Sequence, residues 1–366
     1  MHHPLFAPLC VGRMQLQHRV VFAPITRLRA SSNSEGRVPV NPLMTTYYEQ
    51  RSRRPGTLII SEGALILEEE SGTCLERAPG VWGVGQVKEW KKIAEVVHAN
   101  KSFIFLQLWA QGRPLQPSTV APRANNFPPT PQQGEIQCHR HLTISKMHAC
   151  NDQYVQAARN AINGAGCDGV EVHAGSGYVL DQFLQDVTNQ RPDEYGGSVE
   201  RRSKFPLEVV KAVASAVGEE RVGVRISPWS TYQGMGMVDP IPQFTHFVRA
   251  LRESHPRLAY LHVVEPEMDE AGKGRRIPEQ SNSFLRKLWL PRPLITCEGY
   301  DRESAMRRVK ESPGELVAFG RYFVSNPDLP DRLEHGIPLT PYDPSTFYQG
   351  GEQGYIDYPF ASKKRE

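Results

Sequence analysis

Hydrogen-bonding and charged side chains recur in this sequence where short apolar runs end. The positions are Pro24–Thr26, Glu62–Ala64, Gln107 with Trp109, His173, Arg225, Gly299 and Gly320–Arg321. A Gln or Thr at such a place is more often a satisfied core group than a ligand contact. Brought together, however, these groups form a polar ring suited to a planar heteroaromatic ligand that carries a phosphate.

Eight apolar, β-rich runs must position these groups. They are Arg19–Pro24, Thr57–Glu62, Phe103–Trp109, Asp168–His173, Arg221–Ser227, Leu258–Glu265, Pro293–Glu298 and Glu315–Arg321. Apolar runs without alternation are typical of strands that are covered on both faces.

Segments with helical spacing of apolar residues lie between the runs. They are Val87–Ala99, Asp152–Ala165, Glu200–Val217 with Gly218 as a stop, Pro240–Glu253, Arg302–Lys310 and Asp328–His335. Strands that alternate with helices predict a (β/α)8 barrel, an α/β fold whose catalytic groups lie at the carboxyl ends of the strands. A doubly wound sheet is the alternative, but no G-x-G-x-x-G follows the first strand.

Length and charge narrow the class of protein. The chain has 366 residues, 43 basic and 40 acidic, and its net charge of +3 gives no sign of a nucleic-acid partner. We expect no membrane span, because no apolar run approaches about 18 residues. The segment Met1–Cys10 is too polar and proline-rich for a signal peptide, and six scattered cysteines fit a reducing compartment, so we expect a cytoplasmic protein.

The expected organisation is one domain over residues 1–366. A long, proline-rich segment follows the third strand, and we expect residues 113–145 to form a lid over the active face of the barrel. Residues 337–366 form a C-terminal extension. The sequence is silent on whether the protein is a monomer or a homodimer.

A cluster of soft ligands offers a candidate zinc site. It consists of Cys138, His139, His141, His148 and Cys150, within or beside the expected lid. No pair has the spacing of two to four residues that is usual between zinc-binding cysteines, so we expect no metal.

Six motifs, in order, resemble the old yellow enzyme family of flavin-dependent ene-reductases, which includes the 12-oxophytodienoate reductases. They are FAPITRLRA (22–30), IISEGALI (59–66), FLQLWAQGR (105–113), DGVEVHAGSGYVLDQFL (168–184), QRPDEYGGSVERR (190–202) and FGRYFVSNPDLPDRL (319–333). The resemblance extends from Leu5 to about Tyr358. It also points to reductases and isomerases of fungal secondary metabolism.

The resemblance implies noncovalent FMN as the cofactor. The positions that it assigns to the flavin ring are Pro24, Ile25, Thr26, Gly63, Ala64, Gln107, His173 and Arg225. Gln107 would pair with the pyrimidine half through its donor and its acceptor. Arg225 would face the N1–O2 edge, where negative charge collects on reduction; an ion pair on the barrel top is the other interpretation.

The phosphate is expected at backbone amides after the last two strands, near Gly299, Gly320 and Arg321. The family commonly has two small residues where Cys297, Glu298 and Gly299 stand. Glu298 would repel a phosphate unless its side chain points away, although its backbone amide can still donate.

The segment His173–Tyr178 carries the chemistry that the resemblance implies. His173 would hold the carbonyl oxygen of the substrate, and Tyr178 would give a proton to the α-carbon as general acid. Ser176 stands where the family has a second gripping Asn or His, and its hydroxyl reaches less far. Trp109 and Tyr348 are expected to line the substrate pocket, although packing at the barrel top explains them equally well.

The implied function is NADPH-dependent reduction of the C=C bond of an α,β-unsaturated carbonyl compound. The alternatives are an FMN-dependent isomerase, desaturase or cyclisation enzyme, and a noncatalytic flavin-binding protein. The sequence does not reveal the natural substrate or a preference for NADPH over NADH.

Overall fold

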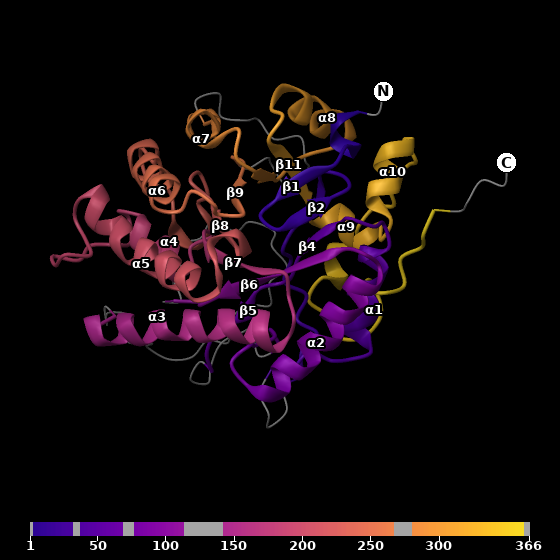
Figure 1. The fold of residues 1–366 in the computed structure, drawn as a ribbon, viewed down its shortest axis with the longest axis horizontal. Helices are drawn as coiled ribbons and strands as arrows, with labels where there is room; N and C mark the ends of the chain where they lie inside the picture. The colour runs from indigo at the N-terminus through magenta and orange to yellow at the C-terminus, as the bar shows by residue number, and fades with distance from the viewer. Residues whose placement is uncertain (1–2, 32–36, 69–76, 113–141, 267–279, 362–366) are drawn as a thin grey trace.

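A closed ring of parallel strands forms the centre of the computed structural model, which describes residues 3–31, 37–68, 77–112, 142–266 and 280–361 (Figure 1). The strands of the ring are β3 (Val20–Phe22), β4 (Leu58–Ile60), β6 (Phe103–Trp109), β7 (Gly169–Ala174), β8 (Val222–Ile226), β9 (Tyr260–Val264), β10 (Leu294–Cys297) and β11 (Glu315–Phe319). The ring closes because β11 pairs with β3, with Phe319 opposite Phe22. The short strand β5 (Ala64–Leu65) extends the pairing along β6. The predicted (β/α)8 barrel is confirmed.

Helices surround the ring on its outer side (Figure 1). They are α1 (Leu43–Ser52), α2 (Val84–Ala99), α3 (Ile144–Arg159), α4 (Val179–Leu184), α5 (Val199–Val217), α6 (Ile241–Ser254), α7 (Ser283–Trp289), α8 (Arg302–Glu311), α9 (Arg321–Ser325) and α10 (Leu329–His335). Within the described ranges, none of these helices combines the length and the apolar character that crossing a bilayer requires.

The helix α3 corrects one boundary. It begins at Ile144, well before the predicted start at Asp152, because Thr143 caps it by accepting from the Lys146 N–H. His148 and Cys150 therefore lie on a helix, and not in a lid. Most of the expected lid, residues 113–141, lies outside the described residues, as do Cys138, His139 and His141. No three ligating side chains gather to hold a metal in the part of the chain that the structure describes.

Several parts of the fold had no counterpart in the sequence prediction, among them an N-terminal hairpin and the helices α1, α4, α7 and α9. The strands β1 (Leu9–Val11) and β2 (Met14–Leu16) form a hairpin. Its buried residues Val11, Met14 and Leu16 join the cluster inside the barrel and close the amino-terminal end, each contributing about 1.5–3 kcal/mol. The helix α1 escaped prediction because its apolar residues follow no clear helical spacing and it buries Arg51 beside Tyr47 and Tyr48.

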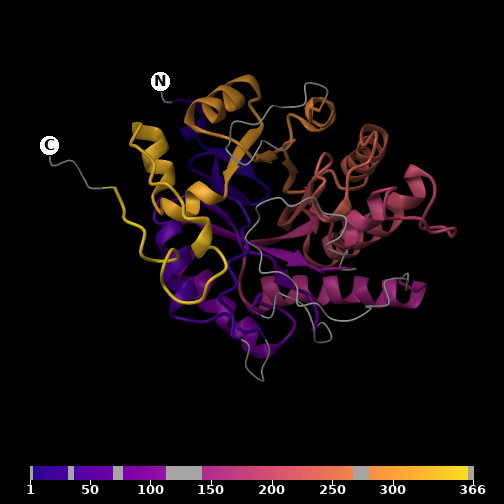
Figure 2. The same ribbon diagram turned by 180° about the vertical axis from the view of Figure 1, so that it is seen from behind.

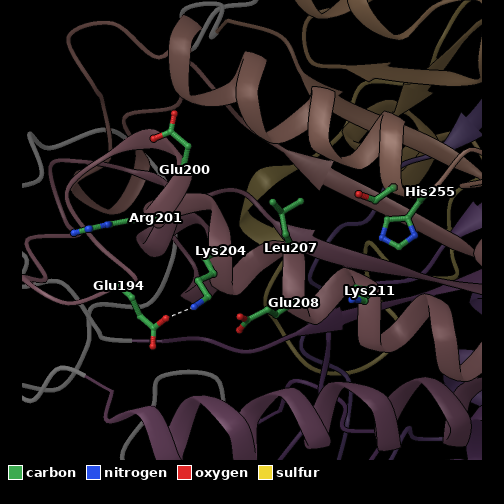
Figure 3. A pocket seen from close by; sticks show the side chains of 9 residues that line it. Glu194, Glu200, Arg201, Lys204, Leu207, Glu208, Lys211 and His255 are labelled. Carbon is green, nitrogen blue, oxygen red and sulfur yellow. Dashed lines mark hydrogen bonds and ion pairs between the residues drawn. The ribbon is translucent and has the colours of Figure 1, made fainter.

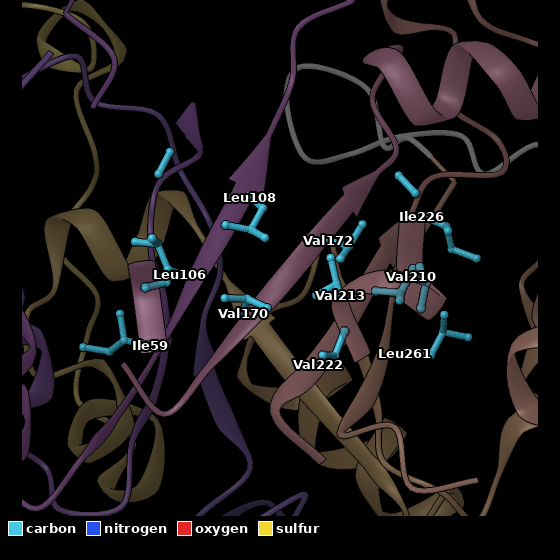
Figure 4. Close-up of a cluster of buried hydrophobic side chains, with 14 of the residues drawn as sticks. Ile59, Leu106, Leu108, Val170, Val172, Val210, Val213, Val222, Ile226 and Leu261 are labelled. Atoms are coloured by element: carbon cyan, nitrogen blue, oxygen red, sulfur yellow. The ribbon is translucent and has the colours of Figure 1, made fainter. Parts of the chain in front are cut away.

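The apolar core has an inner and an outer layer. The outer layer joins strands to helices: Val170 and Val172 of β7 belong to the same buried cluster as Val210 and Val213 of α5 (Figure 4). The inner layer fills the ring. Because successive strand residues point to opposite sides, alternate residues of each strand remain to face the axis of the barrel.

Candidate functional site

The predicted catalytic side chains come together at the carboxyl ends of β6 and β7. Tyr178 lies edge-on to Trp109, with ring centroids 4.8 Å apart and planes at 76°. It also lies edge-on to His173, with centroids 5.1 Å apart. His173 is the fifth residue of β7, whereas Tyr178 immediately precedes α4. The strand and the following turn thus bring residues five positions apart into one aromatic cluster.

The turn between β7 and α4 is held by a buried carboxylate. Asp181 accepts a hydrogen bond from the Gly177 N–H at 2.8 Å. Burial raises the pKa of Asp181 to about 7, although hydrogen bonds from Gly177 and Gln185 oppose the rise. Asp181 therefore fixes the backbone beside Tyr178.

Ser176 lies in the same turn with a left-handed backbone. Its φ is +56°, a conformation that Asn adopts more readily than Ser. Its N–H donates to Ser227 Oγ at 2.7 Å, and Gln233 Nε2 donates to its carbonyl oxygen at 2.9 Å. The position is thus tightly held, but with a shorter side chain than an amide.

His173 is neutral at physiological pH. It is 4% exposed, and burial, followed by the positive charges of Arg225 and His262, lowers its pKa well below the usual range. A neutral imidazole carries one N–H donor and one acceptor nitrogen. His173 is therefore able to donate to an oxygen without placing a full charge in the site.

Tyr348 reaches the same aromatic cluster from the other end of the chain. It packs against the buried cluster of Leu28, Leu65, Ala78 and Trp109, as Tyr178 also does. Burial, followed by the neighbouring Tyr232, raises the pKa of Tyr348 to about 12. Tyr348 thus packs against the same cluster as Tyr178, and its contact with a substrate stays a prediction.

Buried arginines tie the C-terminal extension that carries Tyr348. Arg27 Nε and Arg29 Nη1 both donate to the carbonyl oxygen of Phe347, at 3.1 and 2.6 Å. The ring of Tyr355 stacks on Tyr47 of α1, with centroids 4.0 Å apart. The yellow C-terminal segment accordingly lies along α1 in Figure 2.

The expected flavin positions line the open end of the barrel. Pro24, Ile25 and Thr26 are half-buried after β3, whereas Gly63, Ala64 and Gln107 are buried. A Cβ on Gly63 would lie 2.9 Å from the Trp109 ring, and one on Gly320 would lie 2.6 Å from Ile25 Cδ1. A side chain at either place would force the Trp109 ring or the Ile25 side chain to shift, because the backbone comes close to both.

The residues present fit a flavin. His173 Nδ1, Arg225 Nε and Trp109 Nε1 are buried and have no hydrogen-bond partner among the residues that the structure describes. Unsatisfied buried polar atoms are uncommon in native proteins and call for a ligand or a water molecule. With the amide of Gln107, they supply both donors and an acceptor, which matches the edge of an isoalloxazine ring.

Glu298 does not point away from the expected phosphate position. Its Oε1 lies 2.9 Å from Arg321 Nη2, and its backbone has a φ of +89°. The carboxylate of Glu298 is therefore paired with the guanidinium of Arg321, which is predicted from the sequence to bind the phosphate. The helix α9 that begins at Arg321 has five residues.

Two functional candidates were missed by reasoning from sequence. Glu171 and His262 form a fully buried pair, with His262 Nδ1 2.8 Å from Glu171 Oε2. A signal was present, because Glu171 is a charged residue in the middle of an apolar run and precedes His173 by two residues. In a strand, that spacing places both side chains on the same face.

A groove of about 380 Å³ lies away from the strand ends, on the outer surface of α5 (Figure 3). Charged side chains line it, among them Lys204, which is paired with Glu194. A second groove of about 490 Å³ lies between α6 and α7. The polar groups with no partner described above line neither groove.

Comparison with known proteins finds relatives that match nearly the whole chain. The chain is 43% identical over 367 residues to the chanoclavine-I aldehyde reductase fgaOx3 of Penicillium roqueforti, with 98% of this chain and 97% of that protein covered. It is 40% identical to a probable inactive dehydrogenase, easA, of Claviceps fusiformis, with 98% and 95% covered. The old yellow enzyme structure from Trypanosoma cruzi superimposes with a TM-score of 0.87 at 31% identity, covering 98% of this chain and 99% of that one.

The family model of the NADH:flavin oxidoreductase / NADH oxidase family matches residues 4–340. The match includes every predicted site residue except Tyr348. The chain is therefore an enzyme of this FMN-dependent oxidoreductase family and resembles the old yellow enzymes in fold and sequence.

Proposed function

We propose that the protein reduces the C=C bond of an α,β-unsaturated aldehyde or ketone, with NADPH as the reductant. The observation that carries the proposal is the contact of Tyr178 with both His173 and Trp109 at the open end of the barrel. A neutral N–H donor and a phenol then lie next to each other. The aldehyde reductase of Penicillium roqueforti supports a carbonyl substrate of secondary metabolism.

The side chains of the polar ring would hold FMN. Gln107 and Arg225 would take its pyrimidine edge, Thr26 its C4 side, and Gly63 with Ala64 one rim. When bound, FMN supplies the hydride that reaches the β-carbon of the substrate. The rest of the reaction falls to the side chains of this chain.

His173 holds and polarises the carbonyl oxygen of the substrate. Its N–H donates to that oxygen and stabilises the negative charge that develops there when the β-carbon gains hydride. Tyr178 then gives its hydroxyl proton to the α-carbon, and solvent returns a proton to the phenolate. One hydride and one proton are thus added across the C=C bond, and Trp109 and Tyr348 keep water from the pocket.

Ser176 distinguishes this site from one with two gripping residues. Its short side chain leaves room beside His173, so we infer a substrate bulkier than a simple cyclic enone. Loss of one donor to a developing oxyanion can cost about a hundredfold in rate. A large substrate can offset that loss through contacts with Trp109 and Tyr348.

The competing functions use the same fold without net reduction. An isomerase, desaturase or cyclisation enzyme would not consume NADPH in proportion to product. A noncatalytic flavin-binding protein is a further candidate, because the relative in Claviceps fusiformis is named a probable inactive dehydrogenase. The presence of both His173 and Tyr178 favours the reductase.

The test begins with the absorption spectrum of the purified protein, which should be that of a flavin. Denaturation should release this flavin, because it is bound noncovalently. Under anaerobic conditions NADPH should remove the visible absorbance, and an unsaturated aldehyde should restore it with one NADPH consumed for each C=C bond reduced. Product without NADPH consumption would establish an isomerase instead. If no enone or enal restored the absorbance, the result would favour a noncatalytic flavin-binding protein.

The remaining expectations concern the partners and the compartment of the enzyme. We propose a small-molecule substrate, no nucleic-acid partner and a cytoplasmic location, on the basis of the near-neutral charge and the scattered cysteines. Fractionation of cells that express a tagged chain tests the location.

A further inference from the structure

One half of the ring of strands brings polar side chains into the barrel interior, beside the apolar Phe105 and Tyr260 of the same strands. Four neighbouring strands, β6 to β9, contribute Gln107, Glu171, Arg225 and His262. In the register of the sheet Gln107 lies opposite Glu171, and Arg225 lies opposite His262. The other four strands contribute apolar residues such as Ile295, Leu316, Val21 and Leu58 to the inner cluster. Burying charged side chains lowers the stability of a protein unless the charges are paired. The way in which the four polar residues pair is therefore informative.

Glu171 is the centre of the polar half. It is fully buried and accepts from His262 Nδ1 at 2.8 Å and from Gln107 Nε2 at 2.8 Å. Burial alone would raise the pKa of Glu171, but His262, followed by Arg225 and Gln107, outweighs burial and lowers it. Burial would likewise lower the pKa of His262, but Glu171 and Cys297 raise it. Glu171 and His262 thus form an ion pair. The ionised carboxylate of Glu171 can only accept hydrogen bonds.

The carboxylate of Glu171 determines the orientation of the side-chain amide of Gln107. Because an ionised carboxylate has no proton to donate, the nitrogen of the amide must face Glu171 and the oxygen must face away. The oxygen is directed towards the loop after β4, since a Cβ on Gly63 would lie 3.3 Å from Gln107 Oε1. Gln107 therefore presents an acceptor at the strand ends.

We propose that Glu171 is a positioning residue that fixes Gln107 as a hydrogen-bond acceptor for an N–H group of the bound ligand, with His262 keeping Glu171 ionised. This inference rests on the proposed binding of FMN, whose imide N–H is the matching donor. Glu171 has no contact with the ligand itself and acts through Gln107. Turned the other way, the amide would face that N–H with a second donor.

The experiment measures FMN binding to the apoprotein through the quenching of flavin fluorescence. Glu171→Gln keeps the size of the side chain but offers Gln107 a donor as well as an acceptor. We expect FMN to bind about tenfold more weakly, the size of one lost hydrogen bond. In a Gln107→Ala background the same substitution should change the dissociation constant less than about twofold, because no amide remains to be oriented.

A second measurement uses FMN methylated at the imide nitrogen, which lacks the donor. The protein with Glu171 and Gln107 intact should bind this analogue about tenfold more weakly than FMN, and Glu171→Gln should remove most of that discrimination. Buried Ser203, which bonds to Gln243 between α5 and α6, gives the control Ser203→Ala, a polar change in the outer layer. It should leave both ratios unchanged.

The outcomes separate this inference from the function on which it rests. An equal loss of affinity with and without Gln107 would show that Glu171 only supports the core, and unchanged affinity in Glu171→Gln would also overturn the proposal. If the unaltered protein bound no FMN, the proposed function itself would fail. Should Glu171→Gln not fold, Glu171→Asp draws the carboxylate away from Gln107, and its loss of affinity must likewise vanish in the Gln107→Ala background.

Discussion

Glu298 and Arg321 form an ion pair at the mouth of the barrel, with Glu298 Oε1 2.9 Å from Arg321 Nη2. The two residues follow β10 and β11, which are neighbours in the ring. Both side chains are partly exposed, at 35% and 45%, and an exposed pair of this kind contributes only about 0–1 kcal/mol. A bound phosphate can therefore compete with Glu298 for the guanidinium.

Removal of Glu298 should strengthen the binding of FMN. We expect Glu298→Gly to lower the dissociation constant of FMN about tenfold, because Arg321 becomes free for a charge-assisted bond and the left-handed backbone suits glycine. Riboflavin, which has no phosphate, should change less than about twofold. Fluorescence titration of the apoprotein with both flavins measures the ratio.

Two further variants separate charge from backbone strain in this prediction. Glu298→Gln removes the charge but keeps the side chain and should give most of the gain. Glu303→Gln removes an exposed carboxylate that pairs with Arg302 on α8 and should have no effect. An equal gain for riboflavin and FMN would contradict the role of the phosphate.

Loss of the Tyr178 hydroxyl should block protonation of the substrate. In Tyr178→Phe we expect turnover of an unsaturated aldehyde to fall at least about a hundredfold, the usual contribution of a general acid. Reduction of the enzyme by NADPH should stay within about twofold, since the hydroxyl takes no part in it. Anaerobic stopped-flow absorbance resolves the two half-reactions.

Tyr195 provides the matched control for Tyr178. Its hydroxyl bonds to Glu208 on the outer helix α5, so Tyr195→Phe removes the same atom outside the site. It should leave both half-reactions intact. Equal turnover in Tyr178→Phe and Tyr195→Phe would assign the proton to another group.

Substitution of Ser176 by Asn should improve the grip on small substrates. Asn tolerates the φ of +56° and carries an amide donor towards the carbonyl that His173 holds. We expect kcat/KM for a simple cyclic enone to rise about tenfold or more in Ser176→Asn. Ser176→Ala, which removes only the hydroxyl, is the comparison; if Asn and Ala behave alike for both small and large substrates, position 176 takes no part in recognition.

His18 should make the fold sensitive to acid. It is fully buried, its Nδ1 accepts from the Val20 N–H at 3.3 Å, and its Nε2 lies 3.0 Å from Thr57 Oγ1. Burial, followed by the charge of Arg54, lowers its pKa to about 3, whereas the unfolded chain keeps a value near 6.5. Between these two values the unfolded state binds the extra proton, so stability falls as the pH drops from about 6.5 to about 3.

Denaturant unfolding at a series of pH values measures this effect. His18 should contribute a slope of up to about 1.4 kcal/mol per pH unit within that window. His18→Gln removes the titrating group, so the difference between the two proteins should shrink steadily towards low pH. A difference that stays constant from neutral to acidic pH would mean that His18 has the same pKa in the folded and the unfolded protein.

The sequence alone determined the strands and the candidate residues at their ends. Buried parallel strands must be apolar on both faces, so the eight runs were visible as runs, and polar residues at their ends stood out against them. The motif from His173 to Tyr178 was legible because a strand and a tight turn are local structures. The hairpin of β1 and β2 was not, because two three-residue strands carry too little pattern.

Only the tertiary structure decided which of these groups act on one another. Glu171 and His262 stand far apart in the sequence, and their pairing depends on the register of β7, β8 and β9 around the ring. The same holds for Tyr348, which packs against the same buried cluster as Tyr178 because buried arginines bond to the backbone of a distant segment. Ionisation follows from burial and from neighbours in space, and neither is a property of the local sequence.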